Sequence, residues 1–377
     1  MSQKPLRVLH FYRTSFPDTM GGIEQFINQI ARGCAKSGLG IDVLSLSNHK
    51  DLRVIEIDGY RVHRARLDFE IASTGFSISA FWRFFQLAKH ADIIHYHYPW
   101  PFMDVVHFVT RVCKPTVVTY HSDIIRQVVL LKIYRPLKDK FLSSVSRIVA
   151  TSPNYMASSD ELEKYSDKVT QITYGLDKAA YPQADDDRLA FWRERVGDKF
   201  FLFIGVLRYY KGLHILLEAA EGIDYPIVIV GAGPIEQELH EQALKLGLRN
   251  IHFLGYQTDA DKVALLTLSY AVIFPSHLRS EAFGMSLLEG AMYGKPLISS
   301  EIGTGTTYIN VADETGLVIP PSDPDALRQA MIYLWEHPAQ AAEMGKCAEQ
   351  RYWQLFSAEQ MVQSYVELYR EMVENHQ

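Results

Sequence analysis

Short apolar segments alternate with amphipathic helical segments along both halves of this 377-residue chain. Such an order of buried strands and helices is typical of parallel sheets, which need helices on both faces. We therefore predict an α/β protein with two parallel-sheet domains. Strands are predicted in the first half at residues 7–11, 41–46, 92–95, 116–120 and 147–150, with a hairpin at 53–57 and 60–64, and in the second half at 200–204, 227–230, 251–254, 271–274 and 296–299.

The boundary between the two domains is predicted in residues 181–197, which contain three consecutive aspartates and little apolar pattern beyond a short helix at 189–195. A chain of this length is long enough to form two domains. We assign residues 1–180 to the first domain and 181–355 to the second. A C-terminal helix at 356–377 is expected to pack back on the first domain. Ligands of such sheets bind beyond the carboxyl ends of the strands.

Two carboxylates flank the start of a predicted helix in the second half. Glu281 lies on the loop after strand 271–274, and Glu289 lies in the second turn of a helix that opens at Gly284. The N–H groups at a helix N-terminus favour an anion. Carboxylates on both sides of an anion site suit a phosphate with hydroxyl groups at either end, as in a nucleotide sugar. Solvated glutamates on a loop and a helix are the simpler alternative.

Two polar positions follow strands of the first half. Gly21 and Gly22 stand between strand 7–11 and a helix with apolar residues at positions 23, 26, 27, 30, 31 and 34. Paired glycines permit close approach of a phosphate, but they also make plain tight turns. His121 follows strand 116–120 and could bind a sugar hydroxyl or be satisfied by a backbone carbonyl.

Three further loops of the second half carry candidate ligand groups. Arg208 and Lys211 follow strand 200–204, where cationic side chains could hold a diphosphate or simply be solvated. Gly231 and Tyr256 follow the next two strands, and their loops are candidates for binding a base and ribose. Both loops could also be ordinary strand-end turns.

Composition excludes several classes of protein. No apolar run reaches the length of a membrane span, and the three cysteines and the acidic residues show no metal-ligand spacing. We expect no signal peptide, reduced core cysteines as in a cytoplasmic protein, no metal and no nucleic-acid partner. The first half is net basic although the whole chain has a net charge of −6, so an anionic membrane or acceptor could face that half.

Taken together, these motifs resemble glycosyltransferase family 4, a family of retaining enzymes, over nearly the whole chain. The resemblance implies the GT-B fold, in which two Rossmann-like domains face each other across a cleft. It also implies a nucleotide-sugar donor held mainly by the second domain and an acceptor held mainly by the first. The motifs that carry it are Gly21-Gly22-x-Glu24, residues 173–177, residues 205–212, Gly231-x-Gly233-Pro234, and the Glu281 and Glu289 pair.

The resemblance also assigns roles to residues. Glu289 would bind the ribose, and His121 would contact the donor sugar near the reacting carbon. The diphosphate would be held by Gly22 and Lys211. The family usually has an arginine where this chain has Val206, and Arg208 either substitutes for it or is a surface residue. The donor sugar would be held by Glu281 and by the backbone of Phe283, Gly284 and Met285.

More narrowly, the chain resembles bacterial O-polysaccharide mannosyltransferases and D-rhamnosyltransferases. The residues that carry this include those at 21–25, 71–74, 101–104, 119–123, 152–155, 208–212, 276–284 and 301–306. Such enzymes use GDP-mannose or GDP-D-rhamnose and a polyprenyl-diphosphate-linked acceptor in lipopolysaccharide O-antigen synthesis at the inner face of the cytoplasmic membrane. Guanine would be read by the loops at 231–234 and Tyr256.

The resemblance implies a retaining front-face transfer without a metal cofactor, in which the protein positions the reactants and stabilises the leaving diphosphate. A nucleotide-sugar epimerase and a non-catalytic subunit of a polysaccharide-assembly complex are the alternatives. Basic and apolar residues of segment 124–141, with an aromatic cluster at 81–85, predict peripheral binding to an anionic membrane. Ordinary helix faces would explain these residues equally well.

Overall fold

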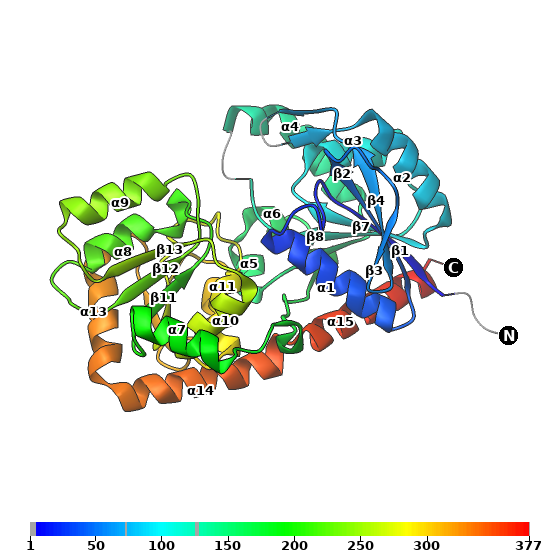
Figure 1. Ribbon diagram of the computed structural model, residues 1–377. Coiled ribbons are helices and arrows are strands. Elements are labelled where there is room, and N and C mark those ends of the chain that lie inside the picture. Colours follow the sequence, from blue (N-terminus) through cyan, green and yellow to red (C-terminus); the bar gives the residue numbers. More distant parts are fainter. Residues whose placement is uncertain (1–4, 72–73, 125–127, 377) are drawn as a thin grey trace. The chain divides into compact units, whose positions relative to one another are not determined.

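The computed structural model describes residues 5–71, 74–124 and 128–376, and the side chains of residues 128–131 lie outside the description. The chain divides into two compact units. Unit 1 comprises residues 1–175 and 358–377, and unit 2 comprises residues 176–357. The predicted boundary at residue 180 and the predicted C-terminal helix from residue 356 stand close to these limits. Both units are α/β, as predicted (Figure 1).

Unit 1 is built on an eight-stranded sheet with the order β10-β9-β8-β7-β1-β2-β4-β3 among the described residues. All of its neighbours pair in parallel except β3 and β4, which form the predicted hairpin. A separate antiparallel pair, β5–β6, was not predicted. The strands are β1 (Arg7–Phe11), β2 (Gly40–Ser47), β3 (Ile55–Ile57), β4 (Tyr60–Arg66), β5 (Phe69–Ile71), β6 (Thr74–Phe76), β7 (Ile93–Tyr98), β8 (Thr116–Tyr120), β9 (Arg147–Ala150) and β10 (Val169–Gln171).

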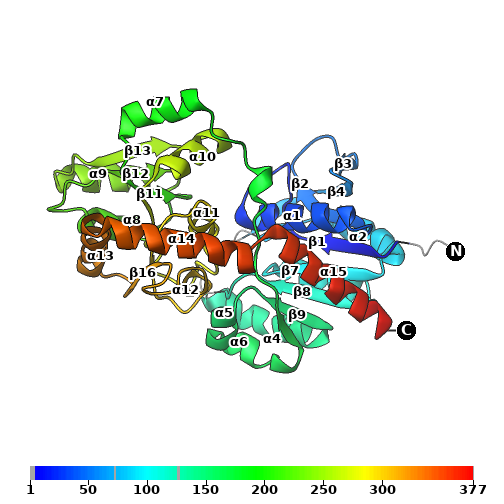
Figure 2. The ribbon, with the colours of Figure 1, turned by 90° about the horizontal axis from the view of Figure 1, so that it is seen from below.

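The helices of unit 1 follow the predicted apolar periodicity. In α1 the buried residues are Phe26, Ile27, Ile30, Ala31 and Cys34. Helix α1 packs against α15, the C-terminal helix, and the two lie side by side (Figure 2). The helices are α1 (Gly22–Lys36), α2 (Ile78–His90), α3 (Pro101–Val109), α4 (Val128–Ser144), α5 (Pro153–Ser158), α6 (Asp160–Glu163), the 3₁₀ helix η1 (Ser166–Lys168) and α15 (Ala358–Glu374).

A glycine permits the close packing of α1 on α15. A Cβ atom added at Gly33 would lie 2.2 Å from Val362 Cγ2, well inside van der Waals contact. Any larger residue at position 33 must therefore push the C-terminal helix away from α1. Because α15 supplies Tyr365 and Tyr369 to the interior of unit 1, this contact ties the end of the chain to the core of its first half.

Unit 2 is a six-stranded parallel sheet with the order β13-β12-β11-β14-β15-β16. The strands are β11 (Phe201–Ile204), β12 (Ile227–Val230), β13 (Ile251–Gly255), β14 (Ala271–Phe274), β15 (Leu297–Ser300) and β16 (Gly316–Ile319). The helices are η2 (Lys178–Ala180), α7 (Asp186–Val196), η3 (Tyr209–Lys211), α8 (Leu213–Ala219), α9 (Glu236–Lys245), α10 (Asp259–Leu268), α11 (Met285–Met292), α12 (Thr306–Ile309), α13 (Pro324–Glu336) and α14 (Pro338–Leu355).

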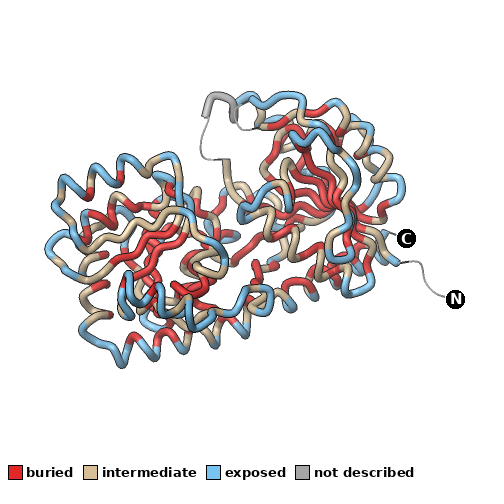
Figure 3. Tube along the Cα trace, in the orientation of Figure 1, coloured by how far each residue is buried: buried red, intermediate tan, exposed pale blue. Residues whose placement is uncertain are grey.

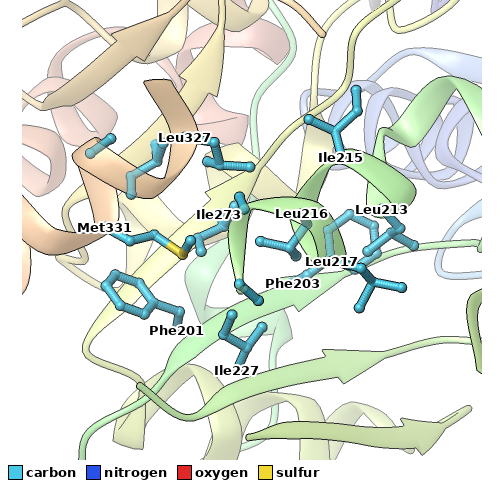
Figure 4. Close-up of a cluster of buried hydrophobic side chains, with 14 of the residues drawn as sticks. Phe201, Phe203, Leu213, Ile215, Leu216, Leu217, Ile227, Ile273, Leu327 and Met331 are labelled. Carbon is cyan, nitrogen blue, oxygen red and sulfur yellow. The ribbon is translucent and has the colours of Figure 1, made fainter. Parts of the chain in front are cut away.

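The core of unit 2 lies between its central strands and the helices on one face. Phe201 and Phe203 of β11 pack with Leu216 of α8 and with Leu327 and Met331 of α13 (Figure 4). In both units the central strands, such as β1, β7 and β8 in unit 1 and β11, β12 and β14 in unit 2, are buried while the outer helix faces are exposed (Figure 3). This is the arrangement expected when a parallel sheet is covered by helices.

Two predictions about single segments need correction. Asp185 to Asp187 are exposed, but they open a helix of unit 2 rather than lie in a linker: Asp185 caps α7 by accepting a hydrogen bond from Arg188 N, and the other two lie in its first turn. Acidic side chains are stabilising there because the N–H groups of a helix start are unpaired. The cysteines were predicted as core residues, but only Cys34 is buried and Cys113 is exposed.

Candidate active site

Four loops of unit 2 meet at one edge of its sheet. Strands β13, β12, β11 and β14 are consecutive in the sheet and parallel, so their carboxyl ends share an edge. The loops after these strands carry the predicted residues Arg208, Lys211, Gly231, Tyr256 and Glu281. The topology therefore brings together the loops that the sequence predicted as a ligand site, at the position where ligands of open α/β sheets bind.

Glu281 and Lys211 form a buried ion pair at this edge. The Glu281 carboxylate accepts a hydrogen bond from Lys211 Nζ, and each side chain is 11% exposed. Ser276 Oγ donates to the same oxygen, Oε2, over 3.2 Å. An ammonium group has three N–H donors, so Lys211 can hold Glu281 and still donate to a phosphate oxygen. The pair places a positive and a negative group of the predicted diphosphate and sugar sites in direct contact.

Glu289 is held by two donors that the sequence analysis did not identify. Tyr181 Oη donates to Oε1 over 2.8 Å, and Lys262 Nζ donates to the same oxygen over 3.0 Å. Within the described residues we find no hydrogen bond to Oε2, which leaves that oxygen to accept from a ligand hydroxyl. Burial lowers the pKa of Lys262, but the neighbouring Glu289 charge more than offsets this and raises the pKa overall. The carboxylate is 5% exposed and fixed in orientation.

Helix α11 opens as predicted at Gly284, which has a φ of 104° and no side-chain cap. The first N–H groups of a helix have no partner within it, so they and the helix dipole favour an anion. Phe283 is buried at 2% exposure, and its ring packs near Phe356. Met285 begins the helix. The backbone from Phe283 to Met285 therefore forms the helix start at which the sugar and phosphate contacts were predicted.

The other predicted residues of unit 2 are differently placed. A Cβ at Gly231 would lie 1.9 Å from the carbonyl oxygen of Gly205, so backbone packing alone requires glycine there. Tyr256 is 78% exposed. Arg208 is exposed, and we find no partner for its side chain in the described part of the chain. Val206, at the position of the family arginine, is also exposed.

The glycine loop of unit 1 is closed by an acidic side chain. Glu24, in the first turn of α1, accepts a hydrogen bond from Thr14 Oγ1 over 2.6 Å. A Cβ at Gly21 would meet the Glu24 carboxylate at 2.3 Å, so the side chain folds back over the loop. Gly22 is exposed at the start of the helix. The two glycines stand between β1 and α1 as predicted, and the Glu24 carboxylate lies over them.

His121 is buried at 3% exposure, and both of its ring nitrogens contact side chains rather than the backbone carbonyl that was the simpler expectation. Nε2 lies 3.0 Å from His97 Nδ1, and Nδ1 is hydrogen-bonded to the Tyr174 hydroxyl. The backbone N–H donates to Tyr98 O, which fixes the residue beside β7. Burial lowers the pKa of His121 to about 3, so the ring is neutral at pH 7.

The histidine network extends further into unit 1. His97 Nε2 lies 3.1 Å from His10 Nδ1, and His95 contacts both Tyr369 Oη and Thr119 Oγ1. In the described residues, His10, His95 and His97 are near enough for metal ligation, with ligand atoms within 4.8 Å of one another. Five of their six ring nitrogens already have hydrogen-bond partners, and only His10 Nε2 lacks one. The group is organised as a hydrogen-bond network.

Sequence reasoning missed Tyr181, Lys262 and His97. Tyr181 fell in the predicted linker, and Lys262 lies on a helix with nothing in its local pattern to mark it. His97 had a detectable signal, since the run Ile93–Tyr98 alternates with period two and places His95 and His97 on one face of β7. The predicted strand ended at residue 95 and so lost that signal.

Comparison with known proteins gives two family matches that together span most of the chain. Residues 20–179 match "Glycosyltransferase Family 4", and residues 186–351 match "Glycosyl transferases group 1". The chain is 64% identical to the D-rhamnosyltransferase WbpZ of Pseudomonas aeruginosa over 94% of its length and 93% of the relative. It is 50% identical to the O-antigen chain mannosyltransferase C of Escherichia coli over 98% of its length and 100% of the relative.

Solved structures share the fold at low identity. Sucrose-phosphate synthase from Thermosynechococcus elongatus matches with a TM-score of 0.83 at 20% identity, over 98% of this chain and 100% of that one. WaaG, a glycosyltransferase involved in lipopolysaccharide biosynthesis, matches with a TM-score of 0.72 at 16% identity, over 96% and 99%. The predicted GT-B fold is thereby confirmed. The chain belongs to glycosyltransferase family 4 and is a hexosyltransferase closely related to the bacterial D-rhamnosyltransferases and O-antigen mannosyltransferases.

Proposed function

We propose that this enzyme transfers an α-linked mannose or D-rhamnose, with retention, from its GDP-sugar to a polyprenyl-diphosphate-linked saccharide in lipopolysaccharide O-antigen synthesis. The names of the two relatives, a D-rhamnosyltransferase and an O-antigen mannosyltransferase, support the sugar and the pathway. The observation that carries the donor assignment is the pair of buried carboxylates. Within the described parts of the chain, Glu281 and Glu289 each have protein donors on one carboxylate oxygen, and the other oxygen is left for a ligand.

The proposed donor lies along the sheet edge of unit 2. The ribose hydroxyls donate to Glu289 Oε2, and hydroxyls of the sugar donate to Glu281. The diphosphate receives N–H donors from the start of α11 and from Lys211. Charge that develops on the leaving diphosphate is stabilised by these fixed donors, which is the main catalytic contribution expected of a protein in a front-face transfer. Arg208 is free of side-chain partners among the described residues and is available to the diphosphate.

The test of the donor is binding and turnover with matched nucleotides. We expect GDP to bind more tightly than UDP or ADP in calorimetric titrations, because a buried base edge left unpaired costs affinity. GDP-mannose or GDP-D-rhamnose should be consumed only when a lipid-diphosphate-linked GlcNAc acceptor is present. Tighter binding of UDP would overturn the donor assignment. Release of free epimerised sugar without acceptor would favour an epimerase, and binding without turnover would favour a non-catalytic subunit.

We also propose that unit 1 binds the anionic inner surface of the cytoplasmic membrane. Among the described helices, none combines the length and hydrophobicity of a membrane span. A shallow apolar groove on α2 and α3 is lined by Ile78, Trp82 and Val109, which are 79%, 66% and 63% exposed. Arg111 lines the same groove, and Lys89 lies 4.1 Å from the Phe85 ring. Exposed apolar residues beside cations favour an anionic interface.

This surface differs from the predicted one in two respects. Phe84, part of the predicted aromatic cluster, is fully buried and belongs to the core. Lys138, one of the basic residues predicted in segment 124–141, is 6% exposed and paired with Glu161. Arg126 lies outside the described residues, as do the side chains of 128–131. The α2–α3 groove therefore has stronger support than α4.

Cosedimentation with vesicles tests the membrane proposal. We expect salt-sensitive binding to vesicles that contain an anionic phospholipid and weaker binding to neutral vesicles. Trp82→Ser should reduce binding, whereas Trp353→Ser, at a 52% exposed tryptophan of unit 2, should not. Equal binding to both kinds of vesicle, or equal loss in both variants, would remove this surface from the proposal.

A further inference from the structure

We propose that His97 is a positioning residue for His121, and that a single direction of hydrogen bonding from His10 through His97 and His121 to Tyr174 sets the tautomer of His121. This inference deepens the proposed function and rests on it in one respect, the contact of His121 with the donor sugar. The network lies within unit 1, where all four side chains are buried.

Three contacts in series define this hydrogen-bond network. His10 Nδ1 lies 3.1 Å from His97 Nε2, and His97 Nδ1 lies 3.0 Å from His121 Nε2. His121 Nδ1 contacts the Tyr174 hydroxyl. Strand pairing produces this order, because β1 and β8 flank β7 in the sheet and the register aligns His97 with Thr119, two residues before His121. His97 and His121 thus each use both ring nitrogens within this network.

Each of the three rings carries one proton. Burial lowers the pKa of His10 to about 3, and burial followed by the neighbouring histidines lowers that of His97 well below its ordinary value. A neutral imidazole has one donor and one acceptor nitrogen. Every ring in the series must therefore donate in the same direction, and a change of tautomer in one forces a change in the next. Only two arrangements satisfy all three contacts.

The His10 end of the hydrogen-bond network distinguishes the two arrangements. His10 Nε2 is buried and has no hydrogen-bond partner among the residues that the structure describes. If the series donates toward His10, this nitrogen carries an unpaired N–H. If it donates toward Tyr174, the nitrogen carries a lone pair. Buried orphan N–H groups are the rarer of the two in proteins. We therefore assign the proton to Nδ1 in His10, His97 and His121, so that His121 Nδ1–H points toward Tyr174.

This tautomer matters for the reaction because of which side of the ring is accessible. His97 is fully buried, whereas Tyr174 is 5% exposed and His121 is 3% exposed. The nitrogen that can exchange its partner for a sugar oxygen is then Nδ1, and only the Nδ1–H tautomer can donate to that oxygen. Loss of the His97 donor would leave His121 Nε2 without a partner and would free the ring to leave the orientation that presents Nδ1–H.

The experiment uses a matched pair of substitutions in the full chain. The amide of asparagine occupies the place of a histidine Nδ1, and that of glutamine occupies the place of Nε2. His97→Asn therefore keeps a donor to His121, and His97→Gln keeps only the contact with His10. With ¹⁵N-histidine labelling, long-range ¹H–¹⁵N spectra separate protonated from unprotonated ring nitrogens. We expect His121 to be protonated at Nδ1 in the wild type and in both variants. Its unprotonated Nε2 should keep a hydrogen-bonded ¹⁵N shift in His97→Asn and move downfield in His97→Gln, where its donor is lost.

Kinetics give a second, separate readout. We expect His97→Gln to lower kcat about tenfold, the size of one lost hydrogen bond, while His97→Asn restores most of it. Both variants should bind GDP as the wild type does. His107→Gln, at a buried histidine outside the series, should leave the His121 spectrum unchanged. Absence of turnover with any GDP-sugar would count against the proposed function and not against the tautomer assignment, which the spectra decide.

A wild-type His121 protonated at Nε2, or a His121 Nε2 shift that His97→Gln leaves unchanged, would overturn the inference. Should the His97 variants fail to fold, the same pair at His10 provides the test, because His10 also contacts His97 through Nδ1. His10→Asn should preserve the hydrogen-bonded ¹⁵N shift of His97 Nε2, and His10→Gln should move it downfield. Identical spectra for those two variants would equally overturn the proposed direction.

Discussion

The two units of this enzyme carry polar groups at comparable edges of parallel sheets, but they bury them in different chemical forms. At the candidate site of unit 1 the buried groups are neutral rings, with His10, His95, His97 and His121 all at 3% exposure or less, while ion pairs such as Lys138–Glu161 lie elsewhere in the unit. In unit 2 they are paired ionic groups, Glu281 with Lys211 and Glu289 with Lys262. Burial without a partner is costly for both, and more so for a charge.

The difference follows from where the side chains originate. The histidines of unit 1 come largely from strands, where neighbouring strands and α15 cover them, so desolvation keeps the rings neutral. The carboxylates of unit 2 come from a loop and a helix start, where long lysine side chains reach them. We infer that the neutral network of unit 1 fixes proton positions, and that the ionic groups of unit 2 fix the electric field that a charged ligand meets.

The largest expected effect is a difference in acid stability between the units. Burial lowers the pKa of His10 and His121 to about 3 and of His107 to about 4, from 6.5 when unfolded. The unfolded state therefore binds protons first as the pH falls. Stability is fully present above pH 6.5 and declines between there and pH 3 to 4, by up to about 1.4 kcal/mol per pH unit for each such ring. Hydrogen exchange should show unit 1 losing protection first on acidification.

Single variants sharpen this prediction. His95→Gln should make the stability of unit 1 less dependent on pH, whatever it does to stability at pH 7, because it removes a ring whose pKa burial lowers well below 6.5. His49→Gln, at a histidine whose side chain is 62% exposed, should leave the pH dependence as it was. Earlier loss of protection in unit 2 would contradict the comparison between neutral and ionic burial.

Breaking the Glu281 ion pair is the next largest effect. Lys211→Met should destabilise the enzyme by about 2–3 kcal/mol in denaturant unfolding, because it leaves a nearly buried carboxylate without its cation. Lys178→Met is the matched control, since the Lys178–Glu349 pair is 33% and 41% exposed and should contribute less than about 1 kcal/mol. Equal losses in the two variants would show that burial does not distinguish these pairs.

The glutamates themselves should separate donor binding from turnover. Glu289→Ala should weaken GDP binding by about 1–3 kcal/mol if a charged hydrogen bond to ribose is lost. Glu281→Ala should depress turnover more than it depresses folding. Calorimetry for the first and steady-state kinetics for the second are the measurements. Wild-type kinetics in both folded variants would show that these carboxylates do not form the donor site.

Replacing Lys262, one of the two donors to Glu289, should have a smaller effect on GDP binding. Lys262→Met leaves Tyr181 bonded to the same carboxylate oxygen, so GDP affinity should fall by no more than about 1.5 kcal/mol. The double variant Lys262→Met with Tyr181→Phe should lose more than either single one. Additive losses in calorimetry would indicate that the two donors act independently rather than as one support.

The smallest expected effect is that of chelation. No divalent-metal clamp was apparent from the sequence, and the donors proposed for the diphosphate are Lys211 and backbone N–H groups. We therefore expect full activity in excess EDTA. Activity that disappears with chelator and returns with magnesium or manganese would show that the diphosphate site is incomplete as proposed.

Local patterns predicted most of the fold. Five predicted strands have the bounds of β1, β8, β9, β12 and β14, because each is a short apolar run between turn residues. The strands that were missed are β5, β6, β10 and β16. Segments of three or four residues such as Val169–Gln171 bury too little apolar surface to show a period, and they pair only because a sheet edge is available.

What the sequence determined by itself is the architecture and the position of the loops. Strand polarity and helical periodicity are local properties, and together they dictate that Lys211, Glu281 and His121 follow the carboxyl ends of parallel strands. The partner of each polar group was decided only by the tertiary structure. His97 meets His121 because β7 and β8 are neighbours in the sheet, and Lys262 meets Glu289 because α10 and α11 bring the two side chains together. A hydrogen bond needs two atoms within about 3 Å, and no pattern along one segment specifies what stands opposite it.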